Sequence, residues 1–360
     1  MAPRARTLTL AALNRTLLAR QLLLERRATP LVRALEAVGG LQAQDPVAPL
    51  FGLLSRLEGF AAEDLGRAVH ERRVVRGTLM RGTVHLVSAR DYLALEPATG
   101  PLVRDLHRRY LRDRADLGDV SGITAEAMAL AAEPMSTAAL HERFGADGWW
   151  RIRREGRFLH APAPGERSGF GRRALFVSAD AWLGAEPDTS RDDALKHLIR
   201  RGLGGFGPMK LADLAAWSGL TAATLRAATE SLPLVRRRDG EGRELLDLPR
   251  RRIVDGDAPA PPRLLAAFDN TILSHADRTR VIDDDARRIV IRGGIVDPVV
   301  LVDGFVRGRW RVARARRAAE LVVEAFAPIP HAHLRALRAE AERTLAFAAP
   351  ESDRRTVRGL

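Results

Sequence analysis

Apolar residues recur at helical spacing through the first part of the chain, and short β-prone runs follow them. Two such runs, residues 74–80 and 83–87, flank a turn at Arg81-Gly82, as is typical of a hairpin. Helices followed by a hairpin are the order of elements in a winged helix, so we predict a unit of this kind over residues 1–89. The helices expected in it cover residues 8–24, 30–38, 49–57 and 61–70.

The same order returns twice further along the chain. Residues 90–188 form the second predicted unit, which starts with helical stretches over residues 90–117 that break at residues 97–101. Residues 189–258 form the third, in which helices around Gly219 make a helix-turn-helix. The further helices and strands expected here cover residues 124–132, 136–144, 158–162, 173–177, 192–202, 210–218, 221–231, 234–237 and 244–248.

The tail, residues 259–360, differs because β-prone runs with Gly or Asp turns replace the helical spacing. A helix over residues 331–348 closes it. The predicted fold class is therefore α+β, with tandem winged-helix (helix-turn-helix) repeats and a C-terminal small antiparallel β-sheet or barrel. The runs assigned to that sheet cover residues 263–268, 288–291, 299–302, 305–312 and 319–326.

Composition excludes several classes of protein. The chain has no cysteine, which excludes a disulfide framework, thiolate chemistry and a cysteine-based zinc site. It also lacks an apolar run long enough to span a membrane. The N-terminus is basic but continues into an arginine-interrupted amphipathic helix, unlike a secretory signal. We therefore expect a cytoplasmic protein.

The formal net charge of +13 favours nucleic acid or another polyanion as a partner. Lys196 and Lys210 are the only lysines, and the abundance of arginine and alanine also fits a GC-rich coding bias. Arginine runs at residues 236–238 and 250–252 and at alternate positions from 307 to 311 are candidate phosphate contacts. Any one run could be an ordinary solvated surface, but several on a helix-turn-helix scaffold favour a duplex.

Gln42 and Gln44 flank Ala43 at the end of the second predicted helix. Gly39-Gly40 before them and Asp45-Pro46 after them indicate a helix end and a turn. Glutamines in such a place are mostly exposed and without function. The alternative is a chemical role, because a neutral amide can hold a water molecule beside a reacting bond.

Four blocks of sequence resemble a known family and favour the chemical role. The blocks cover residues 39–51, 76–87, 206–220 and 268–281. In this order they resemble the bacterial winged-helix DNA glycosylases of the AlkZ/YcaQ type, which remove alkylated purines and unhook interstrand crosslinks. Gln42-Ala43-Gln44 resembles the Gln-aliphatic-Gln motif of the azinomycin-resistance branch, whereas the other branch has Asp at the third position. Asp45 lies one residue too late to take that place.

The resemblance implies a monofunctional glycosylase that hydrolyses the bond between deoxyribose and a bulky N7- or N3-alkylated purine, in DNA repair or genotoxin self-resistance. An N7-alkylated purine is already a good leaving group, so a held water and a polar environment suffice. Gln42 and Gln44 would hold that water and stabilise the sugar cation. No cofactor is implied, and neither lysine is near enough in sequence to suggest Schiff-base chemistry. The expected partner is damaged duplex DNA, bound by a nucleoid-associated monomer.

The predicted hairpin supplies further candidates. Thr83 and His85 share one strand face by the period of two, and Arg76 and Arg81 lie near the same turn. The functional interpretation is a hairpin that contacts the sugar-phosphate backbone or the lesion, with both arginines on phosphates. The structural alternative is a half-buried strand histidine.

Polar residues cluster in residues 268–281, which the resemblance places on the DNA-facing side. Asp269, Asn270, His275 and Arg278 would line the DNA channel. The alternative is a set of capping and turn hydrogen bonds that joins the tail to the third unit. A metal site at His275 and Asp277 is not favoured because third and fourth ligands are missing nearby, and the nucleophile elbow of a hydrolase triad is absent.

Two rival functions remain open at this point. One is a non-enzymatic winged-helix regulator, which would bind intact DNA selectively. Three unequal repeats, the β-rich tail and the lack of a dimerisation heptad count against it. The other is a weakened paralogue that binds the adduct but releases no base.

Overall fold

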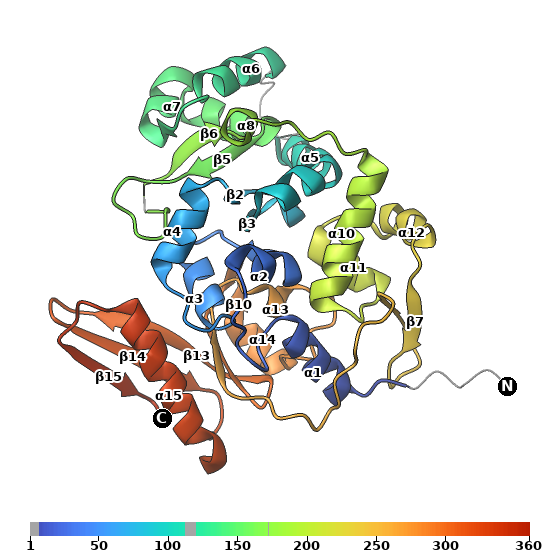
Figure 1. Ribbon diagram of the computed structural model, residues 1–360, viewed down its shortest axis with the longest axis vertical. Helices are drawn as coiled ribbons and strands as arrows, with labels where there is room; N and C mark the ends of the chain where they lie inside the picture. Colours follow the sequence, from blue (N-terminus) through green and yellow to red (C-terminus); the bar gives the residue numbers. More distant parts are fainter. Residues whose placement is uncertain (1–6, 112–119, 172) are drawn as a thin grey trace.

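The N-terminal part of the chain places helices ahead of a hairpin, as predicted (Figure 1). The computed structural model describes residues 7–111, 120–171 and 173–360. The first helix is shorter than predicted because Thr9 caps its start and the chain leaves the helix at Gln21. The elements are α1 (Leu10–Arg20), α2 (Leu31–Ala37), α3 (Ala48–Leu54), α4 (Ala62–His70), β2 (Val74–Thr78), the 3₁₀ turn η1 (Met80–Gly82) and β3 (Val84–Ser88).

The second part repeats a helical region followed by a strand pair. Its predicted helix pair and strand pair are confirmed, and Ser136 caps the second helix of the pair through the amide of Ala139. The elements are α5 (Ala89–Leu111), α6 (Ser121–Leu130), β4 (Met135–Ser136), α7 (Thr137–Phe144), α8 (Ala146–Glu155), β5 (Phe158–Ala161), β6 (Leu175–Ser178) and α9 (Ala179–Leu183).

Helix α5 corrects the prediction of a break at residues 97–101. It runs continuously from Ala89 to Leu111 with Pro97 and Pro101 inside it. Each proline removes one helical hydrogen bond, at a cost of about 3 kcal/mol or more. The helix nevertheless continues because its buried face, with Tyr92 and Leu95, packs in the main core. Residues 112–117 of the predicted helical stretch lie outside the described residues.

The two hairpins join in one six-stranded sheet with the order β1-β3-β2-β5-β6-β4. The predicted helix end is confirmed, because α2 stops at Ala37 ahead of Gly39 and Gly40, which both have a positive φ. The motif itself then begins as the short strand β1 (Leu41–Gln42). It pairs antiparallel with β3, so that Gln42 lies opposite His85. The sheet therefore carries the motif at one edge. It also contains strands from both sides of residue 89, where we predicted a domain boundary, and the division of the chain into domains stays a prediction.

The third part contains the predicted helix-turn-helix. Gly219 ends α11 in the left-handed conformation with a φ of 82°, and Thr221 caps α12 through the amide of Thr224. A hairpin follows, with its turn at residues 239–242. The elements are α10 (Arg191–Phe206), α11 (Leu211–Ser218), α12 (Ala222–Glu230), β7 (Val235–Arg238) and β8 (Glu244–Asp247).

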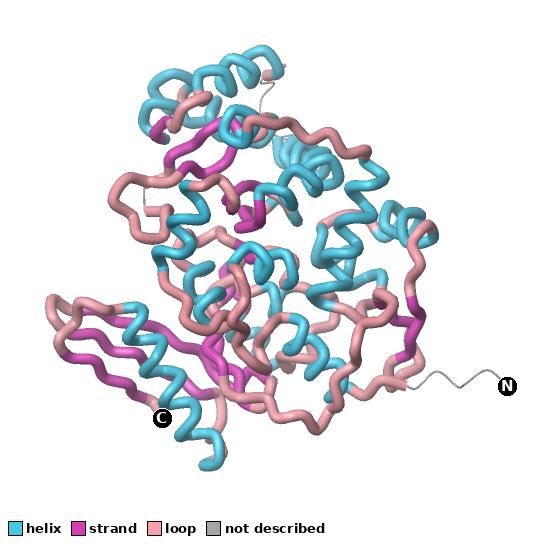
Figure 2. Tube along the Cα trace, viewed as in Figure 1, coloured by secondary structure: helices cyan, strands magenta, loops and turns pink. Residues whose placement is uncertain are grey.

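The C-terminal part is an open five-stranded sheet and not a barrel, with the order β15-β14-β13-β12-β9. The last strand, which was not predicted, pairs parallel to β14, whereas the other pairs are antiparallel. Helix α15 lies across the strands of this sheet (Figure 2). The strands are β9 (Arg263–Leu265), β12 (Val299–Val302), β13 (Phe305–Arg314), β14 (Ala318–Ala325) and β15 (Arg354–Arg358), and α15 covers His331–Ala348.

Residues 288–290 are helical, which corrects the strand predicted over residues 288–291. They end α14 (Asp284–Val290), whose N-cap Asp283 accepts a hydrogen bond from the amide of Ala286. Three consecutive aspartates at a helix start are a favourable N-terminal signal that outweighs the β-prone composition. The short elements that complete this region are α13 (Asn270–Leu273), β10 (Ile291–Arg292) and β11 (Ile295–Val296).

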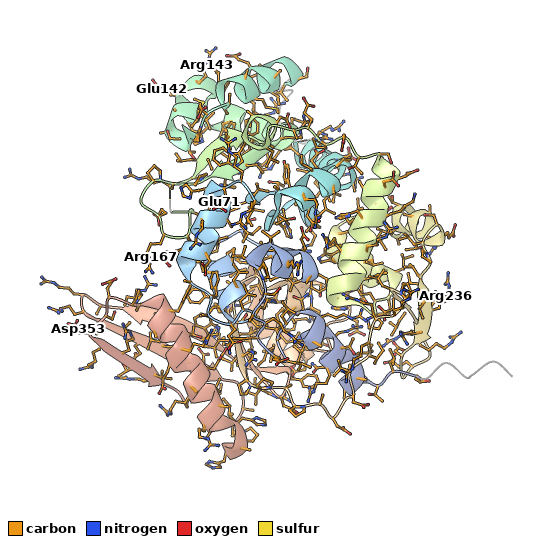
Figure 3. The ribbon with its side chains drawn as sticks, viewed as in Figure 1. Glu71, Glu142, Arg143, Arg167, Arg236 and Asp353 are labelled. Atoms are coloured by element: carbon orange, nitrogen blue, oxygen red, sulfur yellow. The ribbon has the colours of Figure 1, made fainter. Side chains whose placement is uncertain are left out.

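Charged side chains cover the outside of these elements, as Arg167 and Arg236 illustrate in Figure 3. The main core lies inside and draws on all parts of the chain, from Leu17 in α1 to Val306 in β13. Within the described ranges, no helix is both long and apolar enough to cross a membrane.

Candidate active site

Four segments that are distant in sequence meet at Gln42. Arg81 of η1 donates from Nη2 to Gln42 Oε1 at 2.7 Å and to Asn270 Oδ1 of α13 at 3.0 Å. Its Nη1 donates to the main-chain carbonyl of Trp217 near the end of α11. The first glutamine of the motif is thus connected to the hairpin, the helix-turn-helix and the C-terminal part.

Glycines allow these segments to approach one another closely. Gly40 has a φ of 77°, and a Cβ atom there would lie 2.7 Å from a methyl carbon of Val87. Its carbonyl accepts a hydrogen bond from Asn270 Nδ2 at 3.3 Å. A Cβ atom on Gly219 would lie 2.9 Å from the Cα of Arg81. Larger residues at these two positions would separate the motif and the helix-turn-helix from the hairpin.

Arg76 supports the backbone of the motif from inside the protein. Its Nε donates to the carbonyl of Ala43 at 3.0 Å, and its guanidinium lies 5.6 Å from the ring centre of Phe170. The residue is buried, and this burial lowers the pKa of Arg76 to about 10, against the opposing charge of Asp45. We therefore assign Arg76 to support of the motif and withdraw the predicted phosphate contact.

Arg81 also differs from the predicted phosphate contact, because protein acceptors occupy both of its terminal nitrogens. All of these acceptors are neutral oxygens. Burial, together with the like charge of Arg278, lowers the pKa of Arg81 to about 10, so the guanidinium remains a cation at neutral pH. Its geometry is that of a residue that orients Gln42.

Gln44 is the exposed member of the pair. Its Oε1 accepts one hydrogen bond, from the amide of Val84 at 3.3 Å. Thr83 is half-buried beside it, with its hydroxyl donating to the carbonyl of Met80. Asp45 is turned toward the start of α3, where its carboxylate accepts from the amide of Val47 at 2.9 Å. The two amides thus differ, since Gln42 is firmly held and Gln44 faces solvent.

His85 is fully buried opposite Gln42. Its Nδ1 lies 2.9 Å from the carbonyl of Thr83, which can only accept, so Nδ1 carries the proton. Burial and the charge of Arg81 lower the pKa of His85 to about 3, despite the bond to Thr83. Within the described part of the chain, its Nε2 has no hydrogen-bond partner. His85 is thus a neutral strand histidine, as the structural alternative expected, and has no direct access to DNA.

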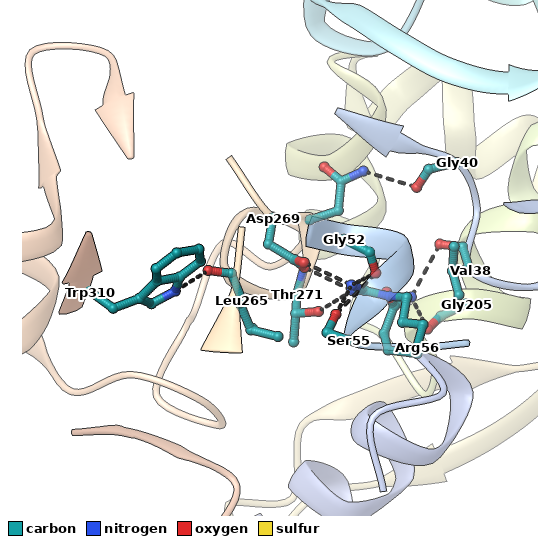
Figure 4. A network of polar contacts seen from close by, with 12 residues as sticks. Val38, Gly40, Gly52, Ser55, Arg56, Gly205, Leu265, Asp269, Thr271 and Trp310 are labelled. Atoms are coloured by element: carbon teal, nitrogen blue, oxygen red, sulfur yellow. Dashed lines mark hydrogen bonds and ion pairs between the residues drawn. The ribbon is translucent and has the colours of Figure 1, made fainter. Parts of the chain in front are cut away.

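Asp269 lies in a buried ion pair that the sequence did not indicate (Figure 4). Its carboxylate receives two hydrogen bonds from Arg56, at 2.8 and 2.9 Å, and one from the amide of Thr271. Burial raises the pKa of Asp269, but the Arg56 guanidinium outweighs it and holds that pKa below its ordinary value. Asp269 therefore fixes the start of α13, and with it Asn270, and does not line a DNA channel.

His275 is likewise a structural residue. Its two ring nitrogens lie 2.9 Å from the hydroxyl of Ser274 and 3.2 Å from the carbonyl of Phe206. Burial and the charge of Arg280 hold the pKa of His275 well below its ordinary value. Asp277, considered with it as a metal ligand, accepts from Lys210 at 3.4 Å. Of the predicted channel residues in this segment, only Arg278 is partly exposed.

Acidic partners neutralise more of the charge of the arginine runs than the sequence predicted. Arg309 in the middle of β13 forms ion pairs with Asp297 and Glu324, so the face of this strand is not wholly cationic. On the helix-turn-helix, Arg226 is the only cation of α12, whose other exposed residues are three alanines and Glu230. This helix offers few side chains for reading base edges in a major groove.

The buried histidines predict a pH dependence of stability. His85 is protonated below about pH 6.5 in the unfolded chain but only near pH 3 in the folded protein. The unfolded state therefore binds more protons in this window, and stability should fall as the pH decreases. We expect His85→Gln to reduce the slope of the unfolding free energy between pH 6 and 5 by about 1 kcal/mol per pH unit, measured by urea denaturation. Equal slopes in both proteins would mean that His85 is charged in the folded state.

Comparison with known proteins identifies the class to which this fold and site belong. The family model of the AlkZ-like DNA glycosylases matches residues 35–347, which include the glutamine motif and all four of the segments that meet at Gln42. The chain belongs to this family, which consists of DNA-acting glycosylases of DNA repair.

A solved structure agrees with this assignment. The chain is similar to the Streptomyces sahachiroi DNA glycosylase AlkZ, with a TM-score of 0.77 and 20% sequence identity. The match covers 98% of this chain and 100% of that one, so the whole fold is shared. A search of curated proteins finds no match.

Proposed function

We propose that this protein is a monofunctional DNA glycosylase that hydrolyses the N-glycosidic bond of bulky N7- or N3-alkylated purines. The proposal includes the unhooking of interstrand crosslinks formed through such purines, in repair or in self-resistance to a genotoxin. Its substrate is damaged duplex DNA, which it binds as a monomer. Family membership supports the glycosylase chemistry, and the site supports the choice of an already activated leaving group.

One observation carries this choice. The motif offers two neutral amides, and no carboxylate of the described chain is hydrogen-bonded to either of them. Asp45 and Asp269, the acids nearest in sequence to the site residues, are engaged with the amide of Val47 and with Arg56. Such a site lacks a strong general acid, so it suits a purine that carries its own positive charge and needs no further protonation.

The two glutamines have different roles at the sugar. Gln44 faces solvent, and among the described residues it has one hydrogen-bond partner, the amide of Val84, so its NH₂ group and one oxygen lone pair are available to hold the hydrolytic water. Gln42 stands beside it at a fixed orientation and contributes to the stabilisation of the transition state. Arg278 and Thr83, which are partly exposed members of the predicted DNA-binding set, contact the sugar-phosphate backbone.

The regulator alternative finds less support. A sequence reader needs several base-contacting side chains on its recognition helix, and α12 offers a single arginine. A Schiff-base lyase also finds less support, because in the part of the chain that the structure describes the two lysines, Lys196 and Lys210, are paired with aspartates.

Single-turnover release of base tests the proposal. The wild-type protein is incubated in excess with a duplex that carries one N7-methylguanine, and in parallel with a duplex that carries a nitrogen-mustard crosslink. Released base and the resulting abasic site are measured over time, together with binding to the same duplexes and to the intact sequence. We expect release from both substrates, with tighter binding to the modified duplexes than to intact DNA.

Other results would replace the proposal. Tight binding to intact duplex without release would favour the regulator. Adduct-selective binding without release would favour a weakened paralogue. Release from N7-methylguanine alone would keep the glycosylase and remove crosslink unhooking.

A further inference from the structure

The chemistry of its neighbours fixes the orientation of the Gln42 amide. A guanidinium can donate hydrogen bonds but cannot accept them, so the Gln42 atom that lies 2.7 Å from Arg81 Nη2 must be the oxygen. The usual ambiguity between the oxygen and the nitrogen of a side-chain amide is therefore resolved for Gln42. Gln42 therefore turns its oxygen inward and its NH₂ group in the other direction.

That NH₂ group is unused. Gln42 is 7% exposed, and within the described part of the chain its Nε2 forms no hydrogen bond. The buried side-chain atoms that lack a hydrogen-bond partner do not include Gln42 Nε2, so this nitrogen is accessible to solvent. A donor held at a site with an unused hydrogen-bonding capacity is preorganised to meet an acceptor on a bound molecule.

Arg81 is itself held rigidly enough to impose this orientation. Its backbone has a φ of 57°, which is the left-handed region. The turn of the helix-turn-helix packs against it, since Gly219 allows contact with the Arg81 backbone and Trp217 accepts from Nη1. With Asn270 as the other acceptor of Nη2, these bonds leave the guanidinium little freedom to turn away from Gln42.

We propose that Arg81 is a positioning residue that presents Gln42 as a hydrogen-bond donor to N3 of the departing purine. N3 is an acceptor on the minor-groove edge of both adenine and guanine. The inference rests on the proposed function and deepens it, because it names the atom of the substrate that Gln42 recognises.

The chemistry of bond cleavage gives this donor its effect. Water adds to C1′ as the C1′–N9 bond breaks, and the electron pair of that bond passes to the purine. The base leaves neutral because N7-alkylation had made it cationic, and the proton of the water passes to solvent. N3 gains electron density during this step, so a donor at N3 binds the transition state more strongly than the ground state.

The same geometry sets a preference between lesions. An alkyl group on N3 removes the acceptor, so Gln42 can assist the release of N7-alkylated purines but not of N3-alkylated ones. Gln44 differs, because its exposed amide is held by one long bond to Val84 and remains free to hold the water.

The experiment compares two duplexes that differ at one atom of the lesion. The first contains N7-methylguanine, and the second contains the same base with N3 replaced by C–H. Single-turnover release is divided by the spontaneous release from each duplex, so that intrinsic reactivity cancels. We expect this ratio for the wild type to be about tenfold lower on the second duplex, which is the effect of losing one hydrogen bond in the transition state.

Variants at Gln42 then assign the effect. Gln42→Ala and Gln42→Glu should both be about tenfold slower than the wild type on N7-methylguanine and insensitive to the change at N3. The glutamate variant is decisive because a carboxylate only accepts at neutral pH. If Gln42→Glu retains the wild-type rate, or if the wild type is insensitive to N3, the donor role is overturned.

A variant at Arg81 tests the positioning role. Arg81→Gln should reduce release from N7-methylguanine about tenfold and abolish the sensitivity to N3, with less than a threefold change in the Kd for that duplex. Arg335→Gln, an exposed arginine of α15, is the matched control. A large rise in Kd with retained N3 sensitivity would make Arg81 a phosphate contact instead. If Arg81→Gln fails to fold, the Gln42 variants decide the donor role alone.

Failure of the inference and failure of the proposed function give different results. Release by the wild type from N7-methylguanine establishes the glycosylase whatever the N3 comparison gives. Absence of that release overturns both.

Discussion

Replacing both motif glutamines by alanine is expected to reduce single-turnover release of N7-methylguanine by about 100-fold or more. Gln42 and Gln44 supply the polar groups proposed to act on the sugar, its water and the leaving base. The loss of about tenfold expected for Gln42→Ala is therefore compounded by the loss of the group that holds the water. The measurement is base release by the Gln42→Ala/Gln44→Ala variant beside the wild type on one duplex. Binding should change little, because the phosphate contacts are left in place.

Gln21 offers a matched control for this result. It is a buried amide whose Nε2 donates to the carbonyls of Val38 and Gly205 and whose Oε1 accepts from Arg56, so none of these hydrogen bonds is made to a glutamine of the motif. Gln21→Ala should lower stability but leave the release rate of the folded protein within a fewfold of the wild type, when measured well below its Tm. Wild-type release by the double motif variant would keep the enzyme and move its catalytic groups elsewhere.

Removal of Arg56 is expected to lower the free energy of unfolding by about 3–5 kcal/mol. Arg56 and Asp269 are each 1% exposed at the side chain and form two hydrogen bonds with one another. Arg56→Ala leaves the Asp269 carboxylate buried without a cation, which is far more costly than the loss of a surface pair. Urea denaturation at neutral pH measures the difference.

Two comparisons test whether burial or charge pairing causes the expected loss of stability in Arg56→Ala. Arg73→Ala breaks an exposed pair with Glu71 and should cost no more than about 1 kcal/mol. The double variant Arg56→Met/Asp269→Leu should recover much of the loss, since apolar residues of similar volume tolerate the buried position. A loss below about 1 kcal/mol for Arg56→Ala would mean that water or another group reaches the carboxylate.

The sequence predicted most of the local elements for a simple physical reason. Helix periodicity and capping residues act over a few residues, so the helix-turn-helix around Gly219 and the cap at Thr221 could be recognised from spacing alone. The same is true of the hairpin at Arg81-Gly82 and of α15. The errors arose where packing outweighed local preference, as in α5 with its two internal prolines.

The candidate site divides in the same way. Gln42 and Gln44 could be singled out because a motif in a recognisable order of blocks is a property of the sequence. The roles of Arg76, Arg81 and Asp269 could not, because an arginine looks the same in sequence whether it meets a phosphate or an inner carbonyl. Arg56, the partner of Asp269 from more than 200 residues earlier, carried no signal at all.

By itself, then, the sequence determined the α+β class, the order of helices and hairpins and the location of the glutamine motif. Only the tertiary structure decided which groups surround that motif. It buried Arg76 against the backbone of the motif, turned Asp45 and Asp269 toward structural partners, and fixed the Gln42 amide through Arg81. The reason is that hydrogen-bond partners and burial depend on contacts between distant segments, which local spacing does not specify.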